Sequence, residues 1–271
     1  MKQKIFIISC IALILLAFFL RVYRLPETLM FLSDQGRDAV VLKRLVTLEK
    51  MVFVGPTTSI GNVFTGPAYY YLVAPFMLIW GMNPVGPAYG VSLINTFGLL
   101  ACVYLVYKLF GKKYALILLL LGGFSANQIL QSRFSWNPNP LPIFAFASIL
   151  TFFIANRRKN KLWFALSGLL FGISLQLHYI AIVIPFFSFG LVKMNIKKKL
   201  DVEVVKKTVI SVLIVAIVAI STFTPLILFE IKNGFVNTKT LLRASSTHAL
   251  ACVRNGLKRL SSQVDCLICP R

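Results

Sequence analysis

The sequence is poor in acidic residues and in charged residues of any kind. Only 8 of its 271 residues are Asp or Glu, and charged side chains make up 14% of the chain, whereas they make up roughly a quarter of a soluble domain. A hydrophobic share of 58% and a mean hydropathy of +0.80 indicate a polytopic membrane protein instead. The net charge of +21 does not indicate nucleic-acid binding, because the basic residues form short clusters between apolar runs.

Several common signals are also missing. The apolar stretch after MKQK is followed by RVYRLPE without a small-x-small cleavage site, so we expect an uncleaved first helix. No internal repeat and no soluble domain are visible in the sequence. Cys10 and Cys102 lie inside apolar runs, where a thiol behaves as a small hydrophobe. Cys266 and Cys269 have a metal-binding spacing, but a single pair of cysteines is a weak signal.

Apolar runs long enough to cross a bilayer recur along the chain, at about twenty residues each. The stretch 162–192 is too long for one span and is interrupted by QLHY, so we interpret it as two spans. We therefore predict an all-α polytopic membrane protein with about seven transmembrane helices and two juxtamembrane helices on the outer face. The remaining predicted spans are residues 5–22, 86–107, 114–131, 140–155 and 208–228.

The basic clusters predict the orientation of these helices, because cytoplasmic loops carry the excess of Lys and Arg. Placing all four dense clusters inside requires an even number of crossings between the first two, and the runs 5–22 and 86–107 supply them. The short segment 66–81 then cannot span and is expected to lie along the outer interface. We expect a plasma-membrane protein with a cytoplasmic N-terminus. The clusters are Lys2/Lys4, Lys108/Lys112/Lys113, Arg157/Arg158/Lys159/Lys161 and the lysines between Lys193 and Lys207.

The first outer loop, residues 23–85, holds half of the acidic residues of the chain. Within it, residues 36–50 form an amphipathic pattern that predicts a helix with an apolar face at Val40, Val41, Leu45, Val46 and Leu48. Two further polar stretches, SRFSWNPNP (132–140) and LQLHY (175–179), join spans on the same predicted side. Polar groups that converge at one membrane face suggest a site there rather than a pore.

These features resemble a known family. A short first helix, an acidic motif early in the outer loop, the segment GPAYYYL and a later SR…P junction are similar to the glycosyltransferases of the type C fold. These family 39-like proteins include protein O-mannosyltransferases and lipid A aminoarabinose transferases. Their first outer loop carries an Asp-Glu pair, and Asp34 and Gln35 stand at that position here. Asn137 and Asn139 stand where an aspartate usually follows the SR junction, and His178 where a lysine is common.

The resemblance implies transfer of a sugar from a polyprenyl phosphate to a hydroxyl of a lipid, glycan or protein acceptor, with inversion at the anomeric carbon. Asp34 would be the catalytic base, and Arg37, Arg133 and His178 would bind the phosphate. No metal site is predicted, and a divalent cation stays an open alternative. Membrane lipids are expected partners and nucleic acid is not. The further substrate-binding candidates are Asp38, Tyr69, Tyr70, Asn137, Asn139 and Gln176, and Tyr71 completes the tyrosine run.

Each candidate also has a structural interpretation. Asp34, or Ser33 before it, could cap a helix that starts near Gly36. Asp38 could pair with Arg37 or Lys43 on a solvated face. Arg133 could stack on Trp136, His178 could form an interhelical hydrogen bond, and the tyrosines could form an interfacial belt.

Two other functions stay open, a lipid or solute transporter and an inactive membrane scaffold. The pattern of apolar runs stops after about residue 240, so the sequence predicts a transmembrane domain over 1–240 and an atypical tail over 241–271. We expect the tail to reflect a truncated or frameshifted reading frame.

Overall fold

The computed structural model describes residues 3–58, 63–193 and 202–243, and its regular elements in these ranges are helices. The predicted all-α class is therefore confirmed for the described residues, where a single β-bridge joins Thr57 to Phe64. The chain divides into two compact units, residues 1–56 with 65–226, and residues 57–64 with 227–271. Each unit is described below by itself.

Three helices of the larger unit are individually long and apolar enough to cross a membrane: α1 (Gln3–Val22), α5 (Gly86–Phe110) and α8 (Leu141–Arg158). At about 1.5 Å per residue, 20 residues cover roughly 30 Å, the thickness of a bilayer core. The helix α5 ends at Gly111, whose φ of 92° is accessible mainly to glycine. These three helices agree with the predicted spans 5–22, 86–107 and 140–155.

Two other apolar runs form bent pairs of helices rather than single rods. Helices α6 (Lys112–Phe124) and α7 (Ala126–Ser132) meet at 59°, because Ser125 between them is extended. Helices α11 (Val202–Ser221) and α12 (Thr224–Lys232) also follow one another with a 59° bend. Counting each pair as one span raises the number of candidate spans in the described residues from three to five. The predicted spans over 114–131 and 208–228 thus coincide with these bent pairs, and the sequence did not predict the bends.

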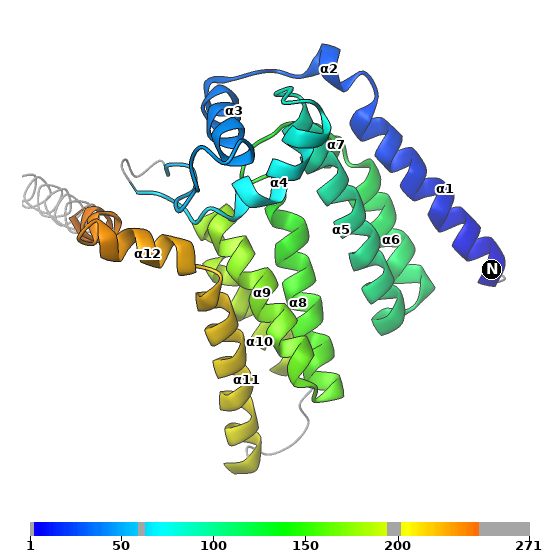
Figure 1. Ribbon diagram of the computed structural model, residues 1–271. Helices are drawn as coiled ribbons and strands as arrows, with labels where there is room; N and C mark the ends of the chain where they lie inside the picture. Colours follow the sequence, from blue (N-terminus) through cyan, green and yellow to red (C-terminus); the bar gives the residue numbers. More distant parts are fainter. Residues whose placement is uncertain (1–2, 59–62, 194–201, 244–271) are drawn as a thin grey trace, which may run out of the picture. The chain divides into compact units, whose positions relative to one another are not determined.

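The stretch 162–192 breaks where the sequence predicted. Helix α9 (Lys161–Leu177) ends at the extended residue His178, and a 3₁₀ turn (Tyr179–Val183) leads into α10 (Ile184–Lys193). Helices α8, α9 and α11 pack side by side (Figure 1). The contact between α8 and α9 includes a hydrogen bond from Ser148 Oγ to the carbonyl of Ser167, and small residues let α9 and α11 approach closely.

Three helices lie in the segment predicted as the first outer loop: α2 (Leu25–Thr28), α3 (Ser33–Val46) and α4 (Ala68–Ile79). Helix α3 begins three residues before the predicted start at Gly36 and ends four residues before the predicted end. Its buried residues recur at helical spacing: Gln35, Asp38, Leu42 and Leu45.

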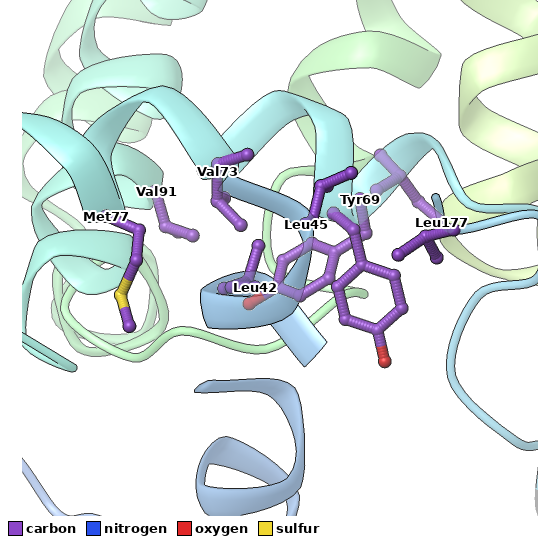
Figure 2. Packing of buried hydrophobic residues seen from close by; sticks show 10 residues of the cluster. Leu42, Leu45, Tyr69, Val73, Met77, Val91 and Leu177 are labelled. Carbon is purple, nitrogen blue, oxygen red and sulfur yellow. The ribbon is translucent and has the colours of Figure 1, made fainter. Parts of the chain in front are cut away.

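The predicted apolar face of α3 is confirmed in part, because Leu45 is buried and Val41 and Val46 pack against the same core. Val40 is 53% exposed and Leu48 lies beyond the helix. Figure 2 shows Leu42 and Leu45 packed with residues of α4, including Tyr69 and Val73. Helix α4 has 12 residues and is too short to cross a bilayer, which fits the prediction that 66–81 does not span.

The smaller unit is held by two side chains that bind backbone groups. The side-chain amide N–H of Asn237 donates to the carbonyl of Phe64, and the side-chain oxygen of Asn237 accepts from the Phe64 N–H at 2.6 Å. The carboxylate of Glu230 accepts from the N–H groups of Asn237 and Thr238, and from the Thr238 hydroxyl at 2.6 Å. An acid at a helix start satisfies free N–H groups. Most of the predicted tail, residues 244–271 with Cys266 and Cys269, lies outside the described residues.

Candidate functional site

The first turn of α3 does not use Asp34 as its cap. The N-cap residue is Leu32, and the side-chain oxygen of Gln35 accepts a hydrogen bond from the Leu32 N–H at 3.1 Å. In a capping box, this bond is the one from the N-cap backbone N–H to the side chain of the third helical residue, and here it forms without a polar N-cap side chain. The interpretation of Asp34 or Ser33 as the cap was therefore wrong, and the carboxylate of Asp34 remains available for other contacts.

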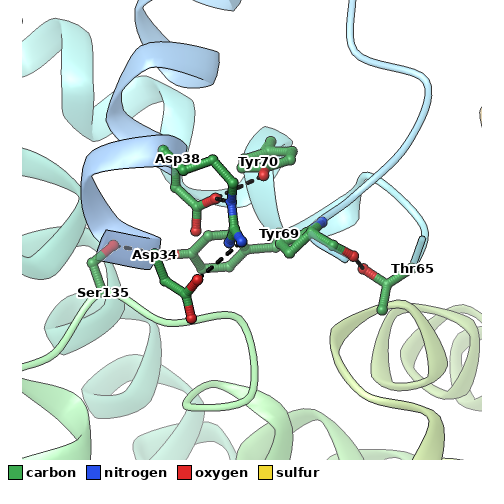
Figure 3. Close-up of polar contacts among 8 residues, drawn as sticks. Asp34, Asp38, Thr65, Tyr69, Tyr70 and Ser135 are labelled. Atoms are coloured by element: carbon green, nitrogen blue, oxygen red, sulfur yellow. Dashed lines mark hydrogen bonds and ion pairs between the residues drawn. The ribbon is translucent and has the colours of Figure 1, made fainter. Parts of the chain in front are cut away.

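Asp34, Arg37 and Asp38 are joined by one guanidinium. The Nη1 atom of Arg37 lies 2.9 Å from Oδ1 of Asp34, and its Nε atom lies 2.9 Å from Oδ1 of Asp38. The side chains of Asp34 and Arg37 are 49% and 37% exposed, whereas that of Asp38 is 2% exposed. The arginine thus connects a buried carboxylate to one at the surface (Figure 3).

Asp38 is the anchor of this group. The hydroxyl of Tyr70 donates to Asp38 Oδ1 at 2.8 Å, while Oδ2 is buried and has no hydrogen-bond partner among the residues that the structure describes. Burial raises the pKa of Asp38, and the hydrogen bonds from Arg37 and Tyr70 oppose that rise without cancelling it. The predicted pairing of Asp38 with Arg37 is confirmed, but the predicted solvated face is wrong, because α4 covers this side of α3.

The electrostatic balance at Arg37 favours its charged form. Burial lowers the pKa of the guanidinium, but the hydrogen bond and the charge of Asp38 outweigh this effect and the pKa is raised overall. A permanently charged arginine therefore sits between two carboxylates. Such an arginine can hold one carboxylate in place and still face an anion through its exposed side.

Tyr69 and Tyr70 are packed inside the protein rather than placed in an interfacial belt. The ring of Tyr69 is fully buried and its hydroxyl lies 2.6 Å from Oγ of Ser135, in the loop after α7 (Figure 3). Burial raises the pKa of both phenols, so both hydroxyls stay protonated. The belt interpretation was wrong for these two residues. Tyr71 is 40% exposed and donates to the carbonyl of Val52.

Arg133 is engaged with the end of α1. Its Nη1 atom donates to the carbonyls of Leu20 and Arg21, and its Nη2 atom donates to the carbonyl of Tyr23 and the hydroxyl of Thr28. A cation at a helix C-terminus satisfies the last free carbonyls. The structure places no cation–π contact on Trp136 among the described residues, where that ring packs against Phe134 instead.

The remaining candidates bind backbone groups. Asn137 donates to the carbonyl of Leu177 at 2.7 Å, and Asn139 donates to the carbonyl of Phe134. Gln176 accepts from the N–H of Ala68 and donates to Thr222, so it ties α4, α9 and the end of α11 together. These three amides are buried and hold the loops that surround the site.

His178 is bound locally. Its Nδ1 atom accepts from the N–H of Ile180 at 3.2 Å, and its ring packs against Tyr179. No hydrogen bond of the described residues joins it to Arg133 or to Asp34. The histidine therefore acts as a cap for the 3₁₀ turn rather than as the interhelical hydrogen-bonder that was one interpretation.

The structure thus brings Asp34, Arg37, Asp38 and Tyr70 into one network and gives the other candidates separate partners. Two buried polar contacts outside this network were not found from the sequence: that of Ser135 with Tyr69, and those of Arg21 in α1. An arginine in the last turn of an apolar helix was the available signal for Arg21. Within the described residues no group of three or more His, Cys, Asp or Glu side chains could hold a metal ion.

Comparisons of the chain with protein-family models, with curated proteins and with solved structures found no match. The site's geometry and the resemblance of its motifs are therefore the basis for a functional proposal.

Proposed function

We propose that the protein is a membrane glycosyltransferase that moves a sugar from a polyprenyl phosphate to an acceptor hydroxyl at the membrane surface, with Asp34 as the base. The observation that carries the proposal is the arrangement around Asp34. Its carboxylate is half exposed, at the start of a helix, and held by an arginine that a buried carboxylate anchors. A fixed but accessible carboxylate has the reach that a general base needs.

The reaction balances with these groups alone. Asp34 takes the proton of the acceptor hydroxyl as that oxygen bonds to the anomeric carbon. The bond between this carbon and the phosphate oxygen breaks, and the polyprenyl phosphate leaves with the electron pair. Attack from the face opposite the phosphate inverts the configuration.

Arg37 is the cation that we assign to the leaving phosphate. It lies beside Asp34, is partly exposed and carries a permanent charge. Charge developing on the phosphate would be stabilised by such a donor. We do not assign Arg133 to the phosphate, although the sequence predicted that role, because its N–H groups already bind the carbonyls at the end of α1.

Transport is the weaker alternative on one specific ground. The three long helices α1, α5 and α8 contain no Asp or Glu, and ion-coupled transporters place ionisable residues near the bilayer midplane. The polar network with carboxylates lies in α3 and α4 instead. This position suits chemistry at a surface.

The test replaces the base while keeping its shape. The full chain in liposomes is given a panel of polyprenyl-phosphate hexoses and pentoses together with lipid, glycan and peptide acceptors that carry hydroxyl groups, and acceptor-dependent release of polyprenyl phosphate is measured. We expect Asp34→Asn to lower the rate by about 10²-fold or more, because a positioned base contributes that much. Glu49→Gln is the matched control, since Glu49 is an exposed acid of the same loop and should be neutral.

An unchanged rate in Asp34→Asn would remove Asp34 from the chemistry and leave Asp38 as the next acid to test. No release by the parent chain with any donor in the panel would instead support the inactive scaffold.

A further inference from the structure

Arg21 is a buried cation that the proposed sugar transfer does not use. It lies in the last turn of α1 and is 2% exposed. Its Nη1 atom donates to the carbonyls of Ala17 and Gly123, and its Nη2 atom donates to the carbonyl of Gly122, each at 2.8 Å. Its Nε atom donates to the hydroxyl of Ser132 at 3.2 Å. The guanidinium thus joins α1 to the break between α6 and α7.

The charge of Arg21 has no acidic partner in the described part of the chain. Both ion pairs found there belong to Arg37. All four acceptors of Arg21 are neutral, and a guanidinium has five N–H groups, so one N–H of Nη2 has no acceptor among the described residues. A buried charge that is balanced only by carbonyl dipoles favours the approach of an anion.

A cavity of about 350 Å³ opens beside this guanidinium. Its polar lining is confined to Arg21, Asn95, Ser125 and Gln128, and the rest of its wall is apolar, including Leu99 and Leu118. The wall is built by α1, α5, α6, α7 and α8, which include all three helices that are individually long enough to span a membrane. From Gly122 back to Leu118 the wall of α6 runs for about 6 Å along the helix axis.

We propose that this cavity binds a phospholipid whose headgroup has a net negative charge, with the phosphate against Arg21 and a hydrocarbon chain along Leu99 and Leu118. The polar and apolar parts of the lining match the two parts of such a molecule, and the unpaired positive charge selects an anionic headgroup. A free phosphate would leave the apolar wall of the cavity uncovered. The lipid site does not depend on the proposed sugar transfer, because none of the cavity's residues belongs to the Asp34 network.

A second groove offers an internal comparison. It has about 420 Å³, lies against α5, α8 and α9, and is lined by residues such as Gly98, Phe144 and Leu166, without any charged side chain. A hydrocarbon chain in that groove would bring no preference for headgroup charge. Of these two hollows, only the Arg21 cavity should therefore prefer an anionic lipid.

The test measures binding of phosphatidylglycerol and phosphatidylcholine with the same acyl chains to the purified full chain, by native mass spectrometry. We expect phosphatidylglycerol to bind about tenfold more tightly or better, because both lipids carry a phosphate but the ammonium group of phosphatidylcholine would place a second positive charge near Arg21. Leu118→Trp fills the cavity and should abolish this preference. Leu120→Trp is the matched control, because Leu120 lies on the same helix, is 45% exposed and does not line the cavity.

A second pair of variants leaves the cavity's packing intact. Leu121 lines the cavity and is 67% exposed, so Leu121→Glu should fold and place a carboxylate near Arg21 that repels phosphate, whereas Leu121→Gln should keep the preference. The proposal is overturned if both lipids bind the parent chain equally, or if Leu121→Glu and Leu121→Gln bind phosphatidylglycerol alike. Full displacement of the lipid by excess inorganic phosphate would equally overturn it, because the hydrocarbon chain would then contribute nothing.

Discussion

The hydrogen bond between Tyr70 and Asp38 should contribute more to stability than the neighbouring bond between Tyr69 and Ser135. Both tyrosines lie on α4 and are buried, and Phe in place of either removes only the hydroxyl. The hydroxyl of Tyr70 donates to a carboxylate at 2.8 Å, whereas that of Tyr69 meets another hydroxyl at 2.6 Å. The two substitutions therefore compare a charged acceptor with a neutral one in nearly the same place.

The structure sets the expected magnitudes. A hydrogen bond to a charged group contributes about 1.5–3 kcal/mol and a neutral one about 1 kcal/mol. Asp38 is 2% exposed, so solvent does not weaken its bond, and its Oδ2 atom already lacks a partner. We expect Tyr70→Phe to destabilise the protein by roughly 2 kcal/mol and Tyr69→Phe by about half of that.

Thermal unfolding of the purified protein in detergent, followed by circular dichroism, measures the difference. Tm should fall by about 4 °C or more for Tyr70→Phe, since 1 kcal/mol shifts Tm by about 2–4 °C in a domain of 150–250 residues. The effect of Tyr70→Phe should shrink as the pH falls through the raised pKa of Asp38, because the bond to a protonated carboxyl is a neutral one. The effect of Tyr69→Phe should not change over that range.

The reasoning is refuted if Tyr69→Phe lowers Tm as much as Tyr70→Phe does. It is also refuted if Tyr70→Phe is equally costly in an Asp38→Asn background, where no carboxylate remains to accept the bond.

Three further predictions follow from other contacts. The folded-state pKa of Asp38 is raised, so the folded state binds more protons than the unfolded state just above the usual Asp pKa. The parent should therefore lose stability as the pH rises from the usual Asp pKa to the raised one. Asp38→Asn, measured in the same Tm series, should lose less stability over this range. Gly66→Ala should destabilise by about 1–3 kcal/mol, since the new Cβ would lie 2.3 Å from the hydrogen-bonded side chain of Gln176; an unchanged Tm would contradict this. Arg133→Gln should speed amide hydrogen exchange at the end of α1 while leaving α8 unchanged, and equal exchange at both helices would argue against its capping role.

The predicted orientation can be tested separately. A cysteine in place of Asn83, just after α4, should react with a membrane-impermeant thiol reagent from the outer side. All five native cysteines are replaced by serine in the parent: Cys10, Cys102, Cys252, Cys266 and Cys269. Reaction only from the cytoplasmic side would contradict the placement of 66–81 outside.

The sequence alone was enough for the helical class, for the three long apolar helices and for the break at His178. Each of these features depends on the composition of one short segment, because about twenty apolar residues in a row are enough to favour a membrane helix whatever they pack against. Asp34, Arg37, Asp38 and Tyr70 became candidates through the resemblance of their motifs to the type C glycosyltransferases. The local pattern did not show the bends after Phe124 and Ser221, because apolar composition continues through both.

Only the tertiary structure decided which of these polar residues are buried and what they bind. Asp38 was placed on a solvated face because charged residues stand beside it in the sequence, and the sequence does not show that α4 covers this side of α3. The partner of Tyr69 is 66 residues away and the carbonyls bound by Arg21 at the end of α6 are 101 and 102 residues away. Such contacts depend on how distant helices pack, and no local pattern contains that information.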